Sequence, residues 1–130
     1  MKLQVTNTFE CDEKIADVIT KLYKKGYIPE FCCSGHPNDM HPYIAFTKNA
    51  SLELDGLYPV NWFGEGYGND NDKYSCYIIR RRFTIKEKIM NRPDDLIDKA
   101  MIELESWVDS LPNSIMNSIY NQYTVEKINN

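Results

Sequence analysis

The stretch SCYIIRRRFT, residues 75–84, has the clearest strand pattern in this chain and is the starting point for the fold. β-favouring residues at its start run directly into three arginines. Because successive side chains of a strand point to opposite faces, the stretch divides into two sets. One face carries Tyr77, Ile79, Arg81 and Phe83, and the other carries Cys76, Ile78, Arg80 and Arg82. The pattern predicts a strand that is apolar at its start and cationic at its end.

Helical periodicity flanks this strand on both sides. Residues 12–25 place apolar side chains at spacings of three, four and seven, and Gly26 supplies a C-terminal stop. A second helix is predicted from Pro93, whose acidic neighbours suit a helix N-terminus, to the residue before Pro112. We expect a shorter helix from residue 113 or 114 to about residue 123, followed by frayed terminal residues.

Shorter segments are assigned from alternation and from turn-forming residues. Strands are predicted at residues 1–9, 27–33, 42–47 and 58–63, and a short helical turn at residues 50–56. The segment 34–41 and the glycine-rich segment 64–72 are predicted to be surface loops, the second one mobile.

The order of these segments predicts the fold class. Strands and helices do not alternate regularly as they do in a doubly wound sheet. We therefore expect an α+β fold, with a mainly antiparallel sheet and with the N-terminal and C-terminal helices packed on one face. The chain has 130 residues, of which 42% are apolar, so it is expected to form one domain over residues 1–130.

Charge and cysteine usage narrow the function classes. The net charge is -4, which argues against general binding of duplex nucleic acid. No apolar run is long enough to cross a bilayer, and the first residues do not resemble a signal peptide, so no membrane association is expected. We expect a cytoplasmic protein, in the host cytoplasm if it is encoded by a phage, whose four cysteines are thiols.

The segment Cys32-Cys33-Ser34-Gly35-His36 is the densest in reactive groups. The favoured hypothesis is an anion-binding turn, in which Ser34, the Gly35 backbone and His36 contact a phosphate. A zinc site completed by His41 or Cys76 is an alternative, although the ligand spacing is poor. A second alternative makes either thiol of this segment a nucleophile with His36 or His41 as its base. No catalytic residue, metal or cofactor is assigned.

The arginine run at residues 80–82 is predicted to form the other side of this anion-binding site. Between residues 80 and 92 six cationic residues face the single carboxylate Glu87, whereas residues 94–109 are acidic and could pair with some of them. Arg81 points away from Arg80 and Arg82, so the three cannot share one partner. Guanidinium groups match phosphate oxygens, and Trp62 and Tyr67 could stack on a base. A solvated edge strand is the competing interpretation.

The motif formed by Gly26-Tyr27, Phe31-Cys32-Cys33-Ser34-Gly35-His36 and Tyr43-Ile44-Ala45-Phe46 resembles short, mostly uncharacterised proteins from phages and prophages of Firmicutes. The likeness covers about residues 15–46 and implies a phage-type accessory protein. A fainter likeness links Cys33-Ser34-Gly35 to a Ser-Cys-Ser-Gly-Arg segment of the wybutosine-synthesis methyltransferase family, from which Cys32 and His36 depart. Small phage proteins with an arginine and aromatic pocket are similar in kind to phage anti-defence sponges, which sequester nucleotide-derived immune signals. The analogy implies a ligand-sequestering role for this chain.

These observations predict a protein that binds and sequesters a small phosphate-bearing, nucleotide-derived molecule without catalysis, with an immune signal as one such ligand. Its expected contacts are Ser34, Gly35, His36, Arg80, Arg82, Trp62 and Tyr67. A homo-oligomer is possible, with the apolar C-terminal helices at the interface. The alternatives are a cysteine- and histidine-dependent enzyme acting on a nucleotide or RNA-derived substrate, and a protein-binding inhibitor of a host factor.

Overall fold

The computed structural model describes residues 6–35, 41–67, 76–115 and 122–128. Within these ranges the elements are β1 (Thr6–Asp12), α1 (Glu13–Lys25), β2 (Pro29–Cys33), β3 (Tyr43–Phe46), α2 (Lys48–Leu54), β4 (Trp62–Tyr67), β5 (Cys76–Arg81), α3 (Ile85–Met90), α4 (Pro93–Ser110) and β6 (Gln122–Ile128).

Strand β5, formed by the SCYIIRRRFT stretch, is an inner strand of a four-stranded sheet. The sheet has the order β2-β3-β5-β4, and each neighbouring pair is antiparallel. The register aligns Cys33, Tyr43, Arg80 and Phe63 in one row across all four strands. The α+β class and the mainly antiparallel sheet are confirmed.

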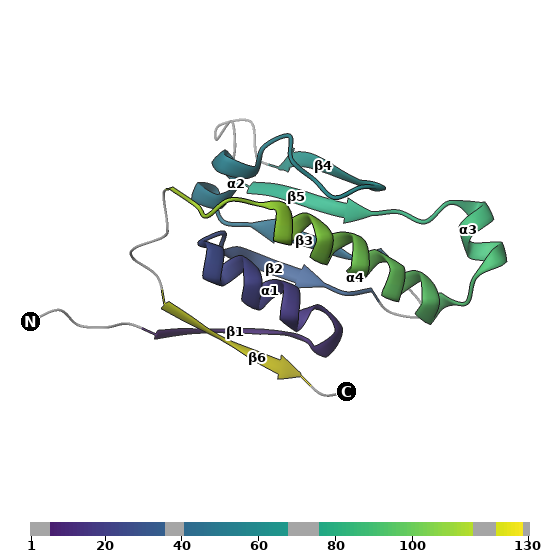
Figure 1. Ribbon diagram of the computed structural model, residues 1–130, viewed down its shortest axis with the longest axis horizontal. Helices are drawn as coiled ribbons and strands as arrows, with labels where there is room; N and C mark the ends of the chain where they lie inside the picture. Colours follow the sequence, from purple (N-terminus) through teal and green to yellow (C-terminus); the bar gives the residue numbers. More distant parts are fainter. Residues whose placement is uncertain (1–5, 36–40, 68–75, 116–121, 129–130) are drawn as a thin grey trace, which may run out of the picture.

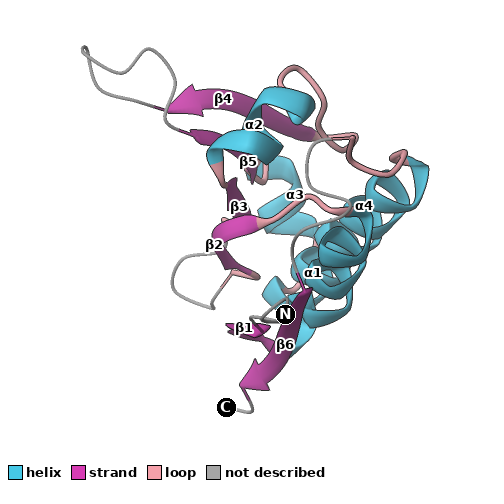
Figure 2. Ribbon diagram, turned by 90° about the vertical axis from the view of Figure 1, so that its left-hand side faces the viewer, coloured by secondary structure: helices cyan, strands magenta, loops and turns pink. Residues whose placement is uncertain are grey.

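Helices α1 and α4 lie on one face of this sheet, as Figures 1 and 2 show, which confirms that the N-terminal and C-terminal helical segments share a side. Helix α1 ends where the sequence predicts, because Gly26 adopts φ 90° and its N–H reaches the carbonyls of Leu22 and Tyr23. No described helix covers the opposite face of the sheet (Figure 2), and we call it the open face.

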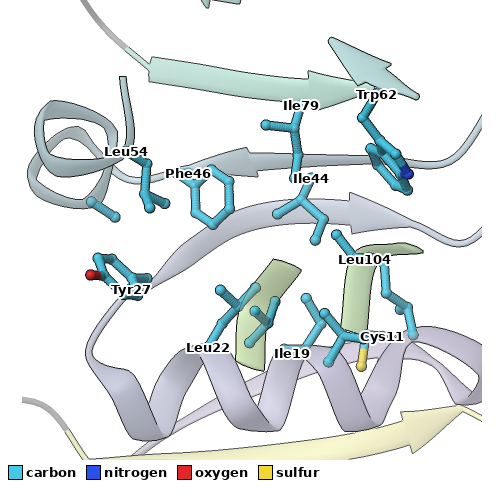
Figure 3. Close-up of a cluster of buried hydrophobic side chains, with 14 of the residues drawn as sticks. Cys11, Ile19, Leu22, Tyr27, Ile44, Phe46, Leu54, Trp62, Ile79 and Leu104 are labelled. Atoms are coloured by element: carbon cyan, nitrogen blue, oxygen red, sulfur yellow. The ribbon is translucent and has the colours of Figure 1, made fainter. Parts of the chain in front are cut away.

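The main core lies between this sheet and the two long helices (Figure 3). Ile19 and Leu22 of α1 point toward Ile44 and Ile79 of the sheet, and all four side chains are fully buried. Helix α4 adds its apolar stripe from Leu96 to Val108 to the same layer. The buried residues of that stripe pack within the chain, and a homo-oligomer through the C-terminal helices stays a prediction.

The ends of the chain form a separate two-stranded parallel sheet, in which β1 pairs with β6 from Thr6–Gln122 to Asp12–Ile128. The strand predicted at residues 1–9 is therefore displaced, and residues 1–5 lie outside the described chain. The predicted last helix and frayed terminus are wrong: residues 113–115 are not helical and Gln122–Ile128 is a strand. The apolar spacing suited a helix, but pairing with a strand more than a hundred residues away decided the outcome.

The region around β4 also differs from the expectation. The strand predicted at residues 58–63 begins only at Trp62, whose N–H bonds to the carbonyl of Pro59 across a turn. Gly64–Tyr67, predicted as the start of a loop, completes this strand, while residues 68–75 lie outside the described chain. Helix α3 was not predicted, because Thr84 was assigned to the strand.

Thr84 instead forms the N-cap of α3. Its hydroxyl accepts a hydrogen bond from the Glu87 N–H, and the Glu87 carboxylate accepts one from the Thr84 N–H. This reciprocal capping box satisfies two N–H groups at the start of the helix, and it fixes the Glu87 carboxylate next to the end of β5.

Candidate functional site

The three arginines of β5 separate onto the two faces of the sheet, as their alternation predicts. Arg81 lies under the helices and is buried, whereas Arg80 is half-buried and Arg82 exposed on the open face. The two faces place these identical side chains in different chemical surroundings. Only the open face, with Arg80 and Arg82, can meet a ligand from solvent.

Arg81 is fully engaged by the protein itself. Its Nε donates to Glu103 Oε1 at 2.8 Å, and its Nη2 donates to Glu87 Oε2 at 2.7 Å and to Glu103 Oε2 at 3.4 Å. Its Nη1 donates to Glu87 Oε1 at 3.1 Å and to the Arg82 carbonyl at 2.9 Å. All five N–H groups of the guanidinium therefore have acceptors, so this arginine holds the fold together rather than binding a ligand.

Trp62 belongs to the same buried network. Its indole Nε1 donates to Glu103 Oε1 at 3.2 Å, and only 4% of the residue is exposed. Figure 3 shows the indole directed into the core. A ring in this position is not accessible for stacking on a base, so Trp62 does not lie with the open-face arginines. The side chain of Tyr67, the other predicted stacking ring, lies outside the described chain.

The pKa of Glu87 makes the network sensitive to acid. Hydrogen bonds from Arg81, and then from the Thr84 N–H, lower the pKa of Glu87 from its ordinary 4.5 to about 2. A lowered carboxyl pKa contributes stability above the unfolded-state value, and this contribution is lost as the pH falls through the folded-state value. We therefore expect Glu87→Gln to lower stability at pH 7 and to flatten the loss of stability between pH 4.5 and about 2, as measured by urea unfolding at each pH.

Lys86→Gln is the matched control for this prediction, because it removes one exposed charge from the same helix and leaves the carboxylates in place. Its stability curve should keep the slope of the wild type in this pH window. An unchanged slope in Glu87→Gln would contradict the assignment of this acid sensitivity to Glu87.

The open face presents two guanidinium groups on aromatic rings. The Cζ atom of Arg80 lies 5.7 Å from the ring centroid of Tyr43, and that of Arg82 lies 5.0 Å from the ring centroid of Phe63. Arg80 Nε also lies 3.3 Å from a carboxylate oxygen of Glu65. In the described part of the chain Arg82 has no carboxylate partner. These contacts orient both cations while leaving charge available to an anion.

Apolar groups continue this surface toward β2. Phe31 is 44% exposed and packs edge-on against Tyr43, with ring centroids 6.1 Å apart. A small second core of Ala45, Cys76 and Ile78 packs against Tyr43. The open face therefore combines exposed aromatic surface with cations, the combination that suits a base linked to a phosphate.

Two buried polar atoms make no hydrogen bond among the described residues: His41 Nδ1, and Arg80 Nε, whose 3.3 Å contact with Glu65 is an ion pair without hydrogen-bond geometry. The Arg81 N–H donates to the Pro42 carbonyl, which continues the antiparallel pairing of Tyr43 with Arg80 by one residue. His41 is the residue before Pro42, next to the end of this pairing. Buried polar atoms without partners are rare in folded proteins, and a bound ligand is one way to satisfy them.

The predicted anion turn does not join these arginines. The hydroxyl of Ser34 donates to Asp12 Oδ2 at 3.1 Å, and Ser34 is 3% exposed beside the start of α1. Gly35 has φ 93° and its N–H donates to Cys33 Sγ at 3.4 Å. The turn follows the end of β2, two strands from β5, and its hydroxyl already serves a carboxylate. His36 lies outside the described residues.

Two of the cysteines, Cys32 and Cys76, have raised thiol pKa values. Burial raises the pKa of Cys32 to about 12, and it also raises the pKa of Cys76. Such thiols carry little of the thiolate that a nucleophile requires. Over the described ranges, no group of three histidine, cysteine, aspartate or glutamate side chains is arranged to hold a metal ion.

Comparison with known proteins adds no assignment, because no family model, no curated protein and no solved structure matches the chain. In the part of the chain that the structure describes, no helix is both long enough and apolar enough to span a bilayer. The candidate site therefore depends on its own geometry.

Tyr43, Phe63 and His41 are the site residues that the sequence analysis missed or assigned otherwise. Tyr43 was placed in a strand without a functional role, Phe63 in a displaced strand, and His41 only as a base or zinc ligand. The alternation of the predicted strand at residues 42–47 carried a signal for Tyr43, but its pairing with Arg80 required the sheet order.

Proposed function

We propose that this protein binds a phosphate-bearing, nucleotide-derived ligand on the open face of its sheet and releases it unchanged. The observation that carries the proposal is the presentation of Arg80 and Arg82 on that face, each against an aromatic ring. Guanidinium groups bind phosphate oxygens in bidentate fashion, and the neighbouring rings offer flat apolar surface to a base. The binding residues in this proposal are Arg80, Arg82, Tyr43, Phe63 and Phe31.

The electrostatics favour a local anion site within an acidic chain. The net charge of -4 repels polyanions at long range, so a large duplex is a poor partner. At short range the exposed Arg82 dominates, and the Arg80 contact with half-exposed Glu65 is of the kind that contributes little and can be exchanged for a phosphate. A small ligand that carries its own phosphate fits this distribution.

In this proposal the protein acts as a sponge: it binds its ligand and leaves it unmodified, as a phage protein that sequesters an immune signal would. The arginine face needs no nucleophile for this role, and the thiols of Cys32 and Cys76 have raised pKa values. Retention of the ligand then depends on affinity and protein concentration alone.

The test is a titration of the chain with the fluorescent nucleotide mant-ATP, competed by ATP, GTP, CTP and UTP. We expect saturable binding that weakens with added salt, and a loss of about tenfold in affinity for Arg82→Ala, the effect of one charge-assisted contact. Nucleotide released by heating should be chromatographically unchanged.

Arg92→Ala is the matched control, because Arg92 is exposed and, within the described ranges, forms an ion pair with Asp95 alone, at the start of α4. It removes the same charge and should retain wild-type affinity. Equal weakening by both variants would reduce the effect to net charge and contradict the proposed site. A complete absence of nucleotide binding would favour a protein partner instead.

A further inference from the structure

From the separation of the two open-face cations, we infer that the ligand bears two phosphoryl groups, one held by Arg80 and one by Arg82. This inference rests on the proposed function and makes its ligand more specific. It names a class that includes nucleoside diphosphates and nucleotides joined in pairs, and it excludes a nucleoside monophosphate as the preferred ligand.

The sheet holds the two guanidinium groups apart. Arg80 and Arg82 are alternate residues of one extended segment, which places their Cα atoms about 7 Å from each other. Arg80 lies against Tyr43 of β3, whereas Arg82 lies against Phe63 of β4, on the other side of β5. A single phosphate bound by both guanidinium groups would pull at least one of them from its ring.

Two polar atoms of the described residues, Arg80 Nε and His41 Nδ1, make no hydrogen bond, although Arg80 Nε has an ion-pair contact with the half-exposed Glu65. Arg80 Nε belongs to the first cation, and His41 Nδ1 lies on the residue before Pro42, whose carbonyl accepts from the Arg81 N–H next to the second cation. A phosphoryl oxygen at each position would satisfy them, since Nε is a donor and an imidazole nitrogen can donate. Two anions suit these positions better than one while each guanidinium stays on its own ring, Arg80 on Tyr43 and Arg82 on Phe63.

The two phosphoryl groups can belong to one diphosphate or to two linked nucleotides. ADP supplies adjacent phosphoryl groups, and the 5′-phosphorylated dinucleotide pApA supplies separated ones. AMP supplies one phosphoryl group with the same base, and adenosine supplies none. These four ligands isolate the number and the spacing of the phosphoryl groups.

Isothermal titration of the four ligands into the wild type, Arg80→Gln and Arg82→Gln tests the inference. In the wild type we expect ADP or pApA to bind at least about tenfold more tightly than AMP, the contribution of one further charge-assisted contact. Either single variant should bring that ratio close to one, while its affinity for AMP falls only about twofold, because the other arginine still binds one phosphoryl group. Circular dichroism verifies that the variants are folded.

The outcomes separate this inference from the proposed function. The two-phosphoryl ligand is contradicted if AMP binds as tightly as the better of ADP and pApA. It is also contradicted if the preference for that ligand over AMP persists in both variants. Nucleotide binding itself stands in either case. If ADP, pApA and AMP all fail to bind and mant-ATP also shows no binding, the proposed function itself is contradicted. The better ligand of the two identifies whether the phosphoryl groups are adjacent or separated.

Discussion

Replacing Arg81 with alanine should lower the free energy of unfolding by about 3–5 kcal/mol, because it leaves the buried Glu103 carboxylate without its cation. Glu103 is 8% exposed and receives two of the hydrogen bonds that would be lost. Such a loss is a large fraction of the total stability of a small domain, which is about 5–15 kcal/mol. Urea unfolding followed by circular dichroism measures it.

Arg82→Ala is the matched control, since it removes the same side chain from the next position of the chain. Arg82 is exposed and contacts the Phe63 ring, so its removal should cost less than about 1 kcal/mol. Arg81→Lys should fall between the two, because lysine keeps the charge but cannot supply the planar set of donors. An Arg81→Ala variant as stable as Arg82→Ala would contradict the role of the buried network.

A double-mutant cycle keeps this prediction testable if Arg81→Ala does not fold. Arg81→Met and Glu103→Leu each break the buried pair, but the double variant removes both charges together. We expect the double variant to be more stable than the sum of the two single effects implies, by at least about 1 kcal/mol. Additive effects would show that the two side chains do not stabilise each other.

Gly64→Ala should destabilise the protein by about 1–3 kcal/mol through overpacking of the core. A Cβ atom at this position would enter the phenol group of Tyr77, 2.9 Å from its Cε1 and nearer still to Cζ and Oη. Tyr77 is 1% exposed and its hydroxyl donates to the Leu57 carbonyl, so the ring has no free space into which it can move. The midpoint of urea unfolding reports the change.

The Tyr77→Leu background provides the control for this steric argument. A leucine leaves the space of the phenol group empty, so Gly64→Ala should cost much less there than in the wild type. Gly56→Ala adds a methyl group where no atom lies within 4 Å, and its cost should come only from the φ of 82°. Equal costs for Gly64→Ala in both backgrounds would exclude the clash with Tyr77.

The sequence predicted the elements that depend on local periodicity. Helix α1, helix α4 and strand β5 were found within a few residues, because their apolar spacing reflects a single buried face. Strand β6 was missed because residues 114–123 have helical spacing, and only pairing with β1 makes the following residues extended. The glycines near residue 64 suggested a loop, but Gly64 is needed in a strand for the ring of Tyr77.

The candidate site was predicted in part. Alternation alone separated Arg81 from Arg80 and Arg82, and the structure confirms that separation. Alternation did not reveal that Ser34 donates a hydrogen bond to Asp12, or that Trp62 donates one to Glu103, because each contact joins segments far apart in the chain. Ligand binding at the open face stays a prediction until the titrations are made.

The sequence by itself determined that β5 has two chemically different faces, because side chains of a strand must alternate whatever surrounds them. Only the tertiary structure decided what each face does. Packing of α4 over one face brought Glu103 to Arg81 and made that arginine structural. Pairing of β5 between β3 and β4 set Tyr43 and Phe63 beside the other two arginines, since rings on neighbouring strands become adjacent only through the sheet order.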